Sequence, residues 1–162
     1  MTDINQPRAF TIEHKGVIDR LKTECGICKE YDPNFEQEAI PLPIHNCKAL
    51  WDTGASKSVI SANVVQALNL ESFGKTLVFH ADGESMLNLY YVNIVLPNNL
   101  GSYTVKVTEG KLTGMDVLIG MDIISQGDFS ITSSKGKTKF SFQVPSTHDI
   151  DYEKECKRKI SK

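Results

Sequence analysis

Apolar and polar residues alternate over several short runs of this sequence, and turn-forming residues separate the runs. The alternation is clearest over residues 103–107 and 138–144, where Phe140 and Phe142 point one way and their polar neighbours the other. A period of two places one set of side chains on each face of a strand. Many short strands punctuated by turns predict an all-β domain.

The length and composition suit one soluble domain. The 162 residues are enough for a single core and too few for two ordinary domains. The net charge of -2 does not favour nucleic acid as a partner. No apolar run approaches the roughly 20 residues that cross a bilayer, and residues 1–6 lack the apolar centre of a signal peptide. We therefore expect no membrane contact and a cytoplasmic protein.

We expect one domain over residues 16–145, between a flexible segment at 1–15 and a charged tail at 146–162. Two short helices are predicted, over 61–68 with Ser61 as its cap and over 122–126 with Asp122 as its cap. The strands are predicted over 16–28, 39–51, 76–80, 86–96, 103–107, 117–119, 129–132 and 138–144.

The run from Ala49 to Ser56, Ala-Leu-Trp-Asp-Thr-Gly-Ala-Ser, is the most informative part of the chain. An apolar strand ends in Asp52, and the next residues make a sharp turn. Gly54 suits a position where the backbone passes close to another group or adopts a positive φ. Thr53 is expected to lock the turn by a hydrogen bond to neighbouring backbone. Asp52 is then a carboxylate held on a rigid loop, which suits general acid–base chemistry.

Peptide hydrolysis by carboxylates needs two of them sharing one proton, because close like charges do not both ionise. No second Asp-Thr-Gly or Asp-Ser-Gly occurs in the chain. The second carboxylate must therefore come from another copy, which predicts a symmetric homodimer with Asp52 and its mate at the axis.

Asp52-Thr53-Gly54-Ala55-Ser56, followed by the run 116–122 (Asp-Val-Leu-Ile-Gly-Met-Asp), resembles the retropepsin-like aspartic proteases of clan AA, of the cellular and bacterial type. The hairpin between the two runs stands where this family has its flap. The resemblance implies a single-lobe acid-protease barrel and a dimeric endopeptidase that cleaves peptide or protein substrates without metal or cofactor. It also implies site roles, catalysis for Asp52 and substrate binding for Thr53, Gly54, Ala55, Ala81, Asp82, Gly83 and Leu118.

Two departures from the viral members keep a second interpretation open. Ser56 and Met121 stand where viral members have an Asp and an Arg that form ion pairs across the dimer. The flap tip also has one glycine, Gly83, rather than several. The alternative is a dimer of the same fold that grips peptides but turns over weakly or not at all.

Cys25 and Cys28 form a Cys-x-x-Cys pair, and His45 and Cys47 would supply the third and fourth ligands of a zinc site. His-x-Cys is a poor second zinc knuckle, and the pair lies in a strand-like stretch rather than at a helix start. We therefore expect small buried thiols here, with zinc or redox chemistry as the weaker alternative.

Overall fold

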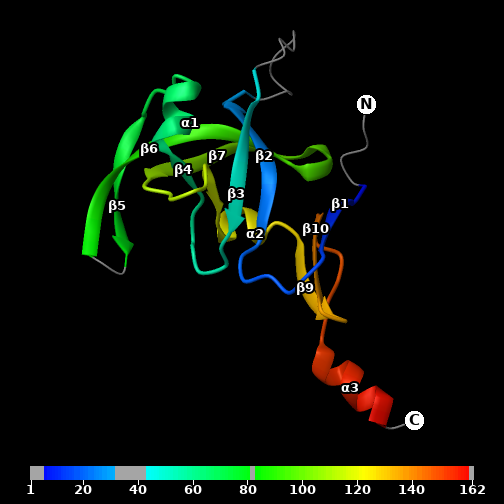
Figure 1. The fold of residues 1–162 in the computed structure, drawn as a ribbon. Helices are drawn as coiled ribbons and strands as arrows, with labels where there is room; N and C mark the ends of the chain where they lie inside the picture. Colours follow the sequence, from blue (N-terminus) through cyan, green and yellow to red (C-terminus); the bar gives the residue numbers. More distant parts are fainter. Residues whose placement is uncertain (1–5, 32–42, 81–82, 161–162) are drawn as a thin grey trace.

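The computed structural model describes residues 6–31, 43–80 and 83–160, which form two β-sheets and short helices (Figure 1). The seven-stranded sheet has the order β2-β3-β8-β4-β7-β6-β5, and β2 also pairs with β6. That additional pairing closes six strands into a barrel and leaves β5 outside it. The elements are β1 (Arg8–His14), β2 (Lys22–Lys29), β3 (His45–Trp51), β4 (Val59–Ser61), α1 (Ala62–Ala67), β5 (Gly74–His80), β6 (Gly83–Leu96), the 3₁₀ turn η1 (Pro97–Asn99), β7 (Leu100–Gly110), β8 (Val117–Ile119), α2 (Met121–Ile124), β9 (Asp128–Ser134), β10 (Lys137–Val144) and α3 (Tyr152–Ile160).

The prediction of an all-β fold with short helices is confirmed, and most expected strands are present. Part of the strand expected over 39–51 lies outside the described residues, and β3 covers its later part. Within the described ranges, no helix combines the length and apolar character that crossing a membrane requires.

The smaller sheet has the order β1-β10-β9. β1 pairs with β10 along its whole length, from Arg8 opposite Val144 to His14 opposite Thr138. The segment 1–15, which we expected to be flexible, therefore contains a strand of the fold. Its sequence signal was weak, because only Phe10 and Ile12 alternate with polar residues there.

Aromatic side chains join the small sheet to the barrel. Trp51, at the end of β3, lies 5.1 Å from both Phe140 and Phe142 between ring centroids. Its Nε1 donates a hydrogen bond to Thr23 Oγ1 at 3.0 Å. All of these residues are buried, as expected for the aromatic positions of β10. The residue before Asp52 is thus fixed by the core of the molecule.

Both helices occur where they were expected, but their caps differ from the prediction. Ser61 lies at the cap position of α1, yet its hydroxyl makes no capping hydrogen bond. The cap residue of α2 is Gly120, one position before the helix. The prediction that Asp122 caps this helix was therefore wrong.

Candidate active site

Asp52 stands where β3 leaves the barrel. β3 runs parallel to β8, with Leu50 opposite Leu118 and Trp51 opposite Ile119. The Asp52 N–H continues this ladder by donating to the Ile119 carbonyl at 2.9 Å. The backbone of this aspartate is therefore as fixed as the sheet, while its side chain is half-buried.

The turn after Asp52 is held by the aspartate itself. Gly54 N–H donates to Asp52 Oδ1 at 2.8 Å, and Ala55 N–H donates to the Asp52 carbonyl at 3.2 Å. A Cβ on Gly54 would lie 3.2 Å from Oδ1, which confirms the predicted close approach. The second carboxylate oxygen has no hydrogen-bond partner within the described ranges, so it is available to a ligand.

Thr53 differs from the expectation. Its side chain is exposed, and no hydrogen bond from its hydroxyl to the rest of the described chain is present. The turn is instead locked by the carboxylate of Asp52, so the prediction that Thr53 locks it within one chain was wrong.

Residues 120 and 121 contact residues 55 and 57 of the loop that carries Asp52, and we call this set of contacts the clamp. Met121 N–H donates to the Ala55 carbonyl at 2.8 Å. A Cβ on Gly120 would lie 2.6 Å from the Lys57 carbonyl carbon, so only glycine lets the two segments pass this closely. The glycine of the second motif therefore fixes the loop that carries Asp52.

Sequence reasoning missed the polar centre of this clamp, formed by Ser58 and Asp122. Ser58 is fully buried, and its hydroxyl donates to Asp122 Oδ1 at 2.7 Å. The same hydroxyl accepts the Gly120 N–H at 3.0 Å, and Ser58 N–H donates to Asp122 Oδ2 at 3.0 Å. The two residues are 64 positions apart, and no local signal pairs them.

Leu118 lies on the same side of the strands as the candidate carboxylate. Val117 and Ile119 are buried in the barrel, whereas Leu118 is half-buried. The continuous apolar run over 117–119 is therefore buried on one face and only half-buried on the other. By the alternation of strand side chains, Leu118 and its neighbour Leu50 share the face to which Asp52 belongs.

The expected hairpin is present as β5 and β6, which pair antiparallel from Gly74 opposite Leu89 to His80 opposite Gly83. Gly83 has a φ of +128°, a conformation that glycine adopts readily. The other two residues of the predicted tip, Ala81 and Asp82, lie outside the described residues. The end of the hairpin and the loop after β3 lie on the same, lower side of the molecule in Figure 1.

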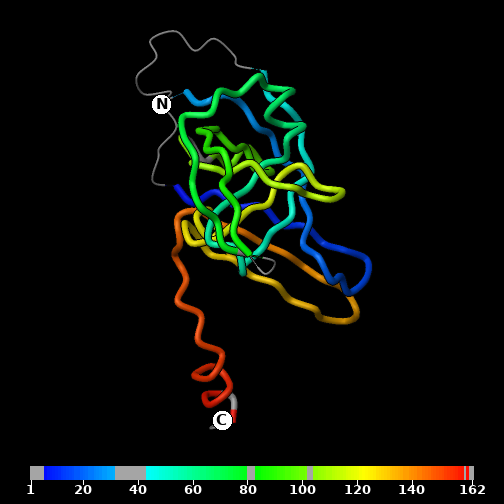
Figure 2. Tube along the Cα trace, turned by 90° about the vertical axis from the view of Figure 1, so that its left-hand side faces the viewer, coloured from blue at the N-terminus to red at the C-terminus, as the bar shows by residue number. Residues whose placement is uncertain are grey.

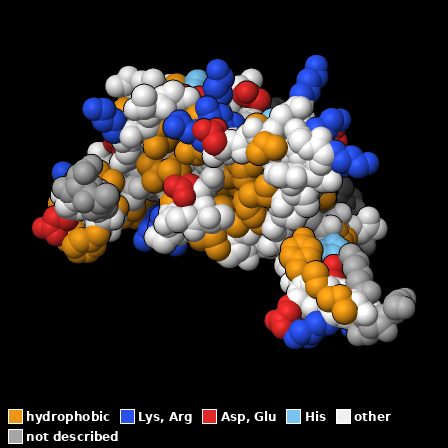
Figure 3. Space-filling view, turned by 60° about the horizontal axis from the view of Figure 1, so that its bottom comes forward, with side chains coloured by type: hydrophobic (Ala, Val, Ile, Leu, Met, Phe, Trp, Pro, Cys, Tyr) orange, Lys and Arg blue, Asp and Glu red, His pale blue; other side chains and the backbone are white. Residues whose placement is uncertain are grey.

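This lower side is rich in apolar side chains, which gather in the middle of the face shown in Figure 3. The hairpin contributes exposed apolar residues as well. Phe79 is 75% exposed, and Leu77 and Met86 are exposed opposite each other. Such a surface beside a half-buried carboxylate suits an extended peptide with apolar side chains.

The thiols behave as expected for buried apolar side chains. Cys25, Cys28 and Cys47 are buried and unbridged. Cys25 lies opposite Cys47, and their contact together with burial raises the pKa of the Cys25 thiol well above its usual value. In the part of the chain that the structure describes, no three His, Cys, Asp or Glu side chains gather as a metal site would require.

A closed barrel, a carboxylate on a loop clamped by an apolar-apolar-Gly strand, and a hairpin beside it define the retropepsin-like class of folds. A retropepsin-like aspartic protease from Rickettsia conorii has this fold, with a TM-score of 0.50 at 14% identity over 86% of this chain and 95% of that chain. The retroviral protease-like domain of Ddi1 from Leishmania major matches at a TM-score of 0.44 and 14% identity, over 76% of this chain and 95% of that one.

The family model of the gag-polyprotein putative aspartyl proteases matches residues 44–126, slightly more than half of the chain. The chain therefore belongs to this retropepsin-like family. No curated protein matches it by sequence.

Proposed function

We propose that the protein is an aspartic endopeptidase whose active site forms between two copies of the chain, each supplying Asp52. The observation that carries the proposal is the arrangement of that carboxylate. Gly54 holds Oδ1, Oδ2 is available, and the adjoining Thr53 and Gly54 are exposed at the end of the barrel. The sequence has no second Asp-Thr-Gly or Asp-Ser-Gly motif, so two copies are needed for a dyad.

In this mechanism the two carboxylates share one proton. The ionised Asp52 takes a proton from water, which attacks the scissile carbonyl carbon. The protonated Asp52 of the other copy donates to the carbonyl oxygen, which becomes the hydroxyl of a tetrahedral intermediate. Collapse of the intermediate breaks the C–N bond as the amine takes a proton from the first Asp52 and one hydroxyl of the intermediate returns a proton to the second. The products are a carboxylic acid and an amine, and the dyad again holds one shared proton.

The substrate would be an extended peptide segment. Thr53, Gly54 and Ala55 would form the floor of its site, with Leu118 as one wall. The hairpin tip, which comprises Ala81, Asp82 and Gly83, would cover the bound peptide. Backbone hydrogen bonds of the kind that strands make would hold it.

A cytoplasmic location is part of the proposal. It is supported by the thiols, because Cys25 and Cys47 lie side by side in register and are not bridged. Unbridged neighbouring thiols suit a reducing compartment.

The test is digestion of a peptide library by the wild type and by Asp52→Asn at several protein concentrations. The proposal predicts cleavage that falls as the protein is diluted, and a loss of at least about 100-fold in the variant. Ser56→Ala is the matched control, because Ser56 is exposed on the same loop and makes no side-chain hydrogen bond in the described part of the chain. Undiminished cleavage by Asp52→Asn would refute the proposal.

The second candidate function is a dimer that binds peptides without cleaving them. It is favoured by Met121 and Ser56, which are exposed and uncharged where viral members form ion pairs. Saturable peptide binding by the wild type and by Asp52→Asn, with no cleavage by either, would favour this peptide-binding function over the endopeptidase.

A further inference from the structure

The last helix, α3, stands away from the rest of the molecule. Both views show it projecting beyond the small sheet (Figures 1 and 2). Every side chain of α3 that the structure describes is exposed. A nine-residue helix is too short to be stable by itself in water, so its stability has to come from a contact with another surface.

Apolar side chains form one stripe on this helix. Tyr152, Cys156 and Ile160 follow one another at intervals of four, so they share one face. Tyr152 is 63% exposed and Ile160 is 86% exposed, and the described residues between them are mostly charged. A single apolar stripe on a charged helix is the pattern of a helix that packs against one surface.

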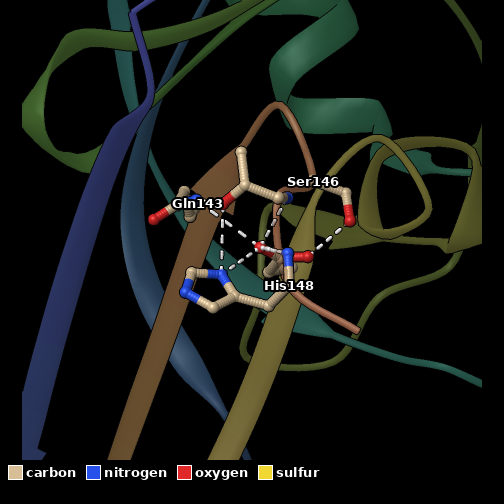
Figure 4. Close-up of polar contacts among 5 residues, drawn as sticks. Gln143, Ser146 and His148 are labelled. Carbon is tan, nitrogen blue, oxygen red and sulfur yellow. Dashed lines mark hydrogen bonds and ion pairs between the residues drawn. The ribbon is translucent and has the colours of Figure 1, made fainter. Parts of the chain in front are cut away.

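The segment leading to α3 is fixed by Asp128, the first residue of β9. This carboxylate accepts hydrogen bonds from the Ser146 hydroxyl, from Thr147 N–H at 2.9 Å and from His148 N–H at 3.1 Å. Figure 4 shows Ser146, His148 and Gln143 converging on it, with His148 Nδ1 at 2.7 Å from Oδ2. These bonds, led by the one from Ser146, hold the pKa of Asp128 well below its usual range. The chain is therefore pinned to the small sheet shortly before the helix begins.

The helix begins at a defined place as well. Lys154 N–H donates to Asp151 Oδ1 at 3.0 Å, which caps the first turn. A pinned and capped helix that projects from the fold presents its stripe in one direction. The helix therefore has a fixed attachment to the small sheet and a defined first turn.

The side to which α3 projects indicates what it contacts. The loop carrying Asp52 lies at the lower side of the barrel in Figure 1, and α3 extends below that side. Figure 3 shows apolar side chains on α3 and in the middle of the same face. A copy that supplies the second Asp52 would approach this face, and α3 projects on the same side.

We propose that α3 is a docking arm that lies against a second copy of this chain, with Tyr152, Cys156 and Ile160 buried in the contact. The inference rests on the proposed function for the direction from which the second copy comes. It adds a separate surface, distant from the aspartates in the sequence, that holds the two copies together.

Cys156 reports on the contact directly, because it is the exposed cysteine on the stripe and Cys25, Cys28 and Cys47 are buried. The rate of its alkylation by iodoacetamide is measured on the full chain across protein concentrations, with Cys156→Ser giving the background. The proposal predicts a rate that falls at least fivefold as the copies associate. A rate independent of concentration, while sedimentation shows dimers, would overturn it.

The second measurement is the dimer dissociation constant of two matched variants. Tyr152→Gln with Ile160→Gln removes the stripe, and we expect the dissociation constant to rise at least tenfold. Arg158→Gln changes an exposed residue on the side of the helix opposite the stripe, and we expect a change below twofold. Equal effects of the two variants, or no effect of the first, would overturn the inference, and circular dichroism checks that the β-sheet fold persists in both.

Neither readout uses peptide cleavage, so the two proposals fail separately. Dimers that bury Cys156 but cleave nothing would refute the endopeptidase and leave the arm in place. Cleavage that depends on dimerisation but not on the stripe would refute the arm alone.

Discussion

Replacing Ser58 by alanine tests whether the clamp beneath the candidate carboxylate is held by this one hydroxyl. Ser58 is fully buried, and its hydroxyl joins Asp122 to the Gly120 N–H. The substitution removes a hydrogen bond to a carboxylate and leaves a buried N–H without its acceptor. Together these losses are expected to cost about 3 kcal/mol of unfolding free energy.

Urea denaturation at one fixed protein concentration measures this cost, and the thermal midpoint should fall by roughly 6–12 °C. The exposed Ser56→Ala should change stability by less than about 0.5 kcal/mol. A double-mutant cycle with Asp122→Ala should give a coupling energy within the range of about 0.5–3 kcal/mol. A loss below about 0.5 kcal/mol for Ser58→Ala, or no coupling to Asp122, would refute the reasoning.

Three further predictions concern two residues that support the loop of Asp52, Gly120 and Trp51, and the carboxylate that holds the segment before α3, Asp128. Gly120→Ala places a Cβ 2.6 Å from the Lys57 backbone and should destabilise the fold by about 1–3 kcal/mol in denaturation, whereas Gly16→Ala, with open space around it, should not. Trp51→Ala empties the aromatic cluster between the two sheets and should cost about 3–5 kcal/mol in the same assay. The lowered pKa of Asp128 stabilises the anchored segment above about pH 4 and loses that effect as the pH falls below it. The protection of amides in that segment, measured relative to their intrinsic exchange rate at each pH, should therefore fall on acidification in the wild type, and in Asp128→Asn it should be low throughout.

Most of the strands and the candidate loop were predictable because their signals are local. Alternation marked the strands, and the Asp52 to Gly54 run indicated a turn with a close backbone approach, which the 2.8 Å hydrogen bond from Gly54 N–H to Asp52 Oδ1 confirms. The hairpin between the two motifs was also predicted, and its strands pair antiparallel from Gly74 opposite Leu89 to His80 opposite Gly83.

The features that escaped prediction depend on partners distant in the chain. Asp122 looked like a helix cap because it begins an apolar turn after glycine, but its partner Ser58 lies 64 positions away. β1 carries few apolar residues, and it forms a strand because its backbone pairs with that of β10. The turn after Asp52 is held by the aspartate's own carboxylate rather than by Thr53, because Gly54 N–H donates to Oδ1.

The most direct test is the distance between the two Asp52 carboxylates in a crystal of the full chain. The account predicts a twofold-related pair whose nearest oxygens are about 3 Å apart, close enough to share one proton. Copies that pack with these carboxylates facing away from each other, together with a strictly monomeric protein in solution, would contradict it.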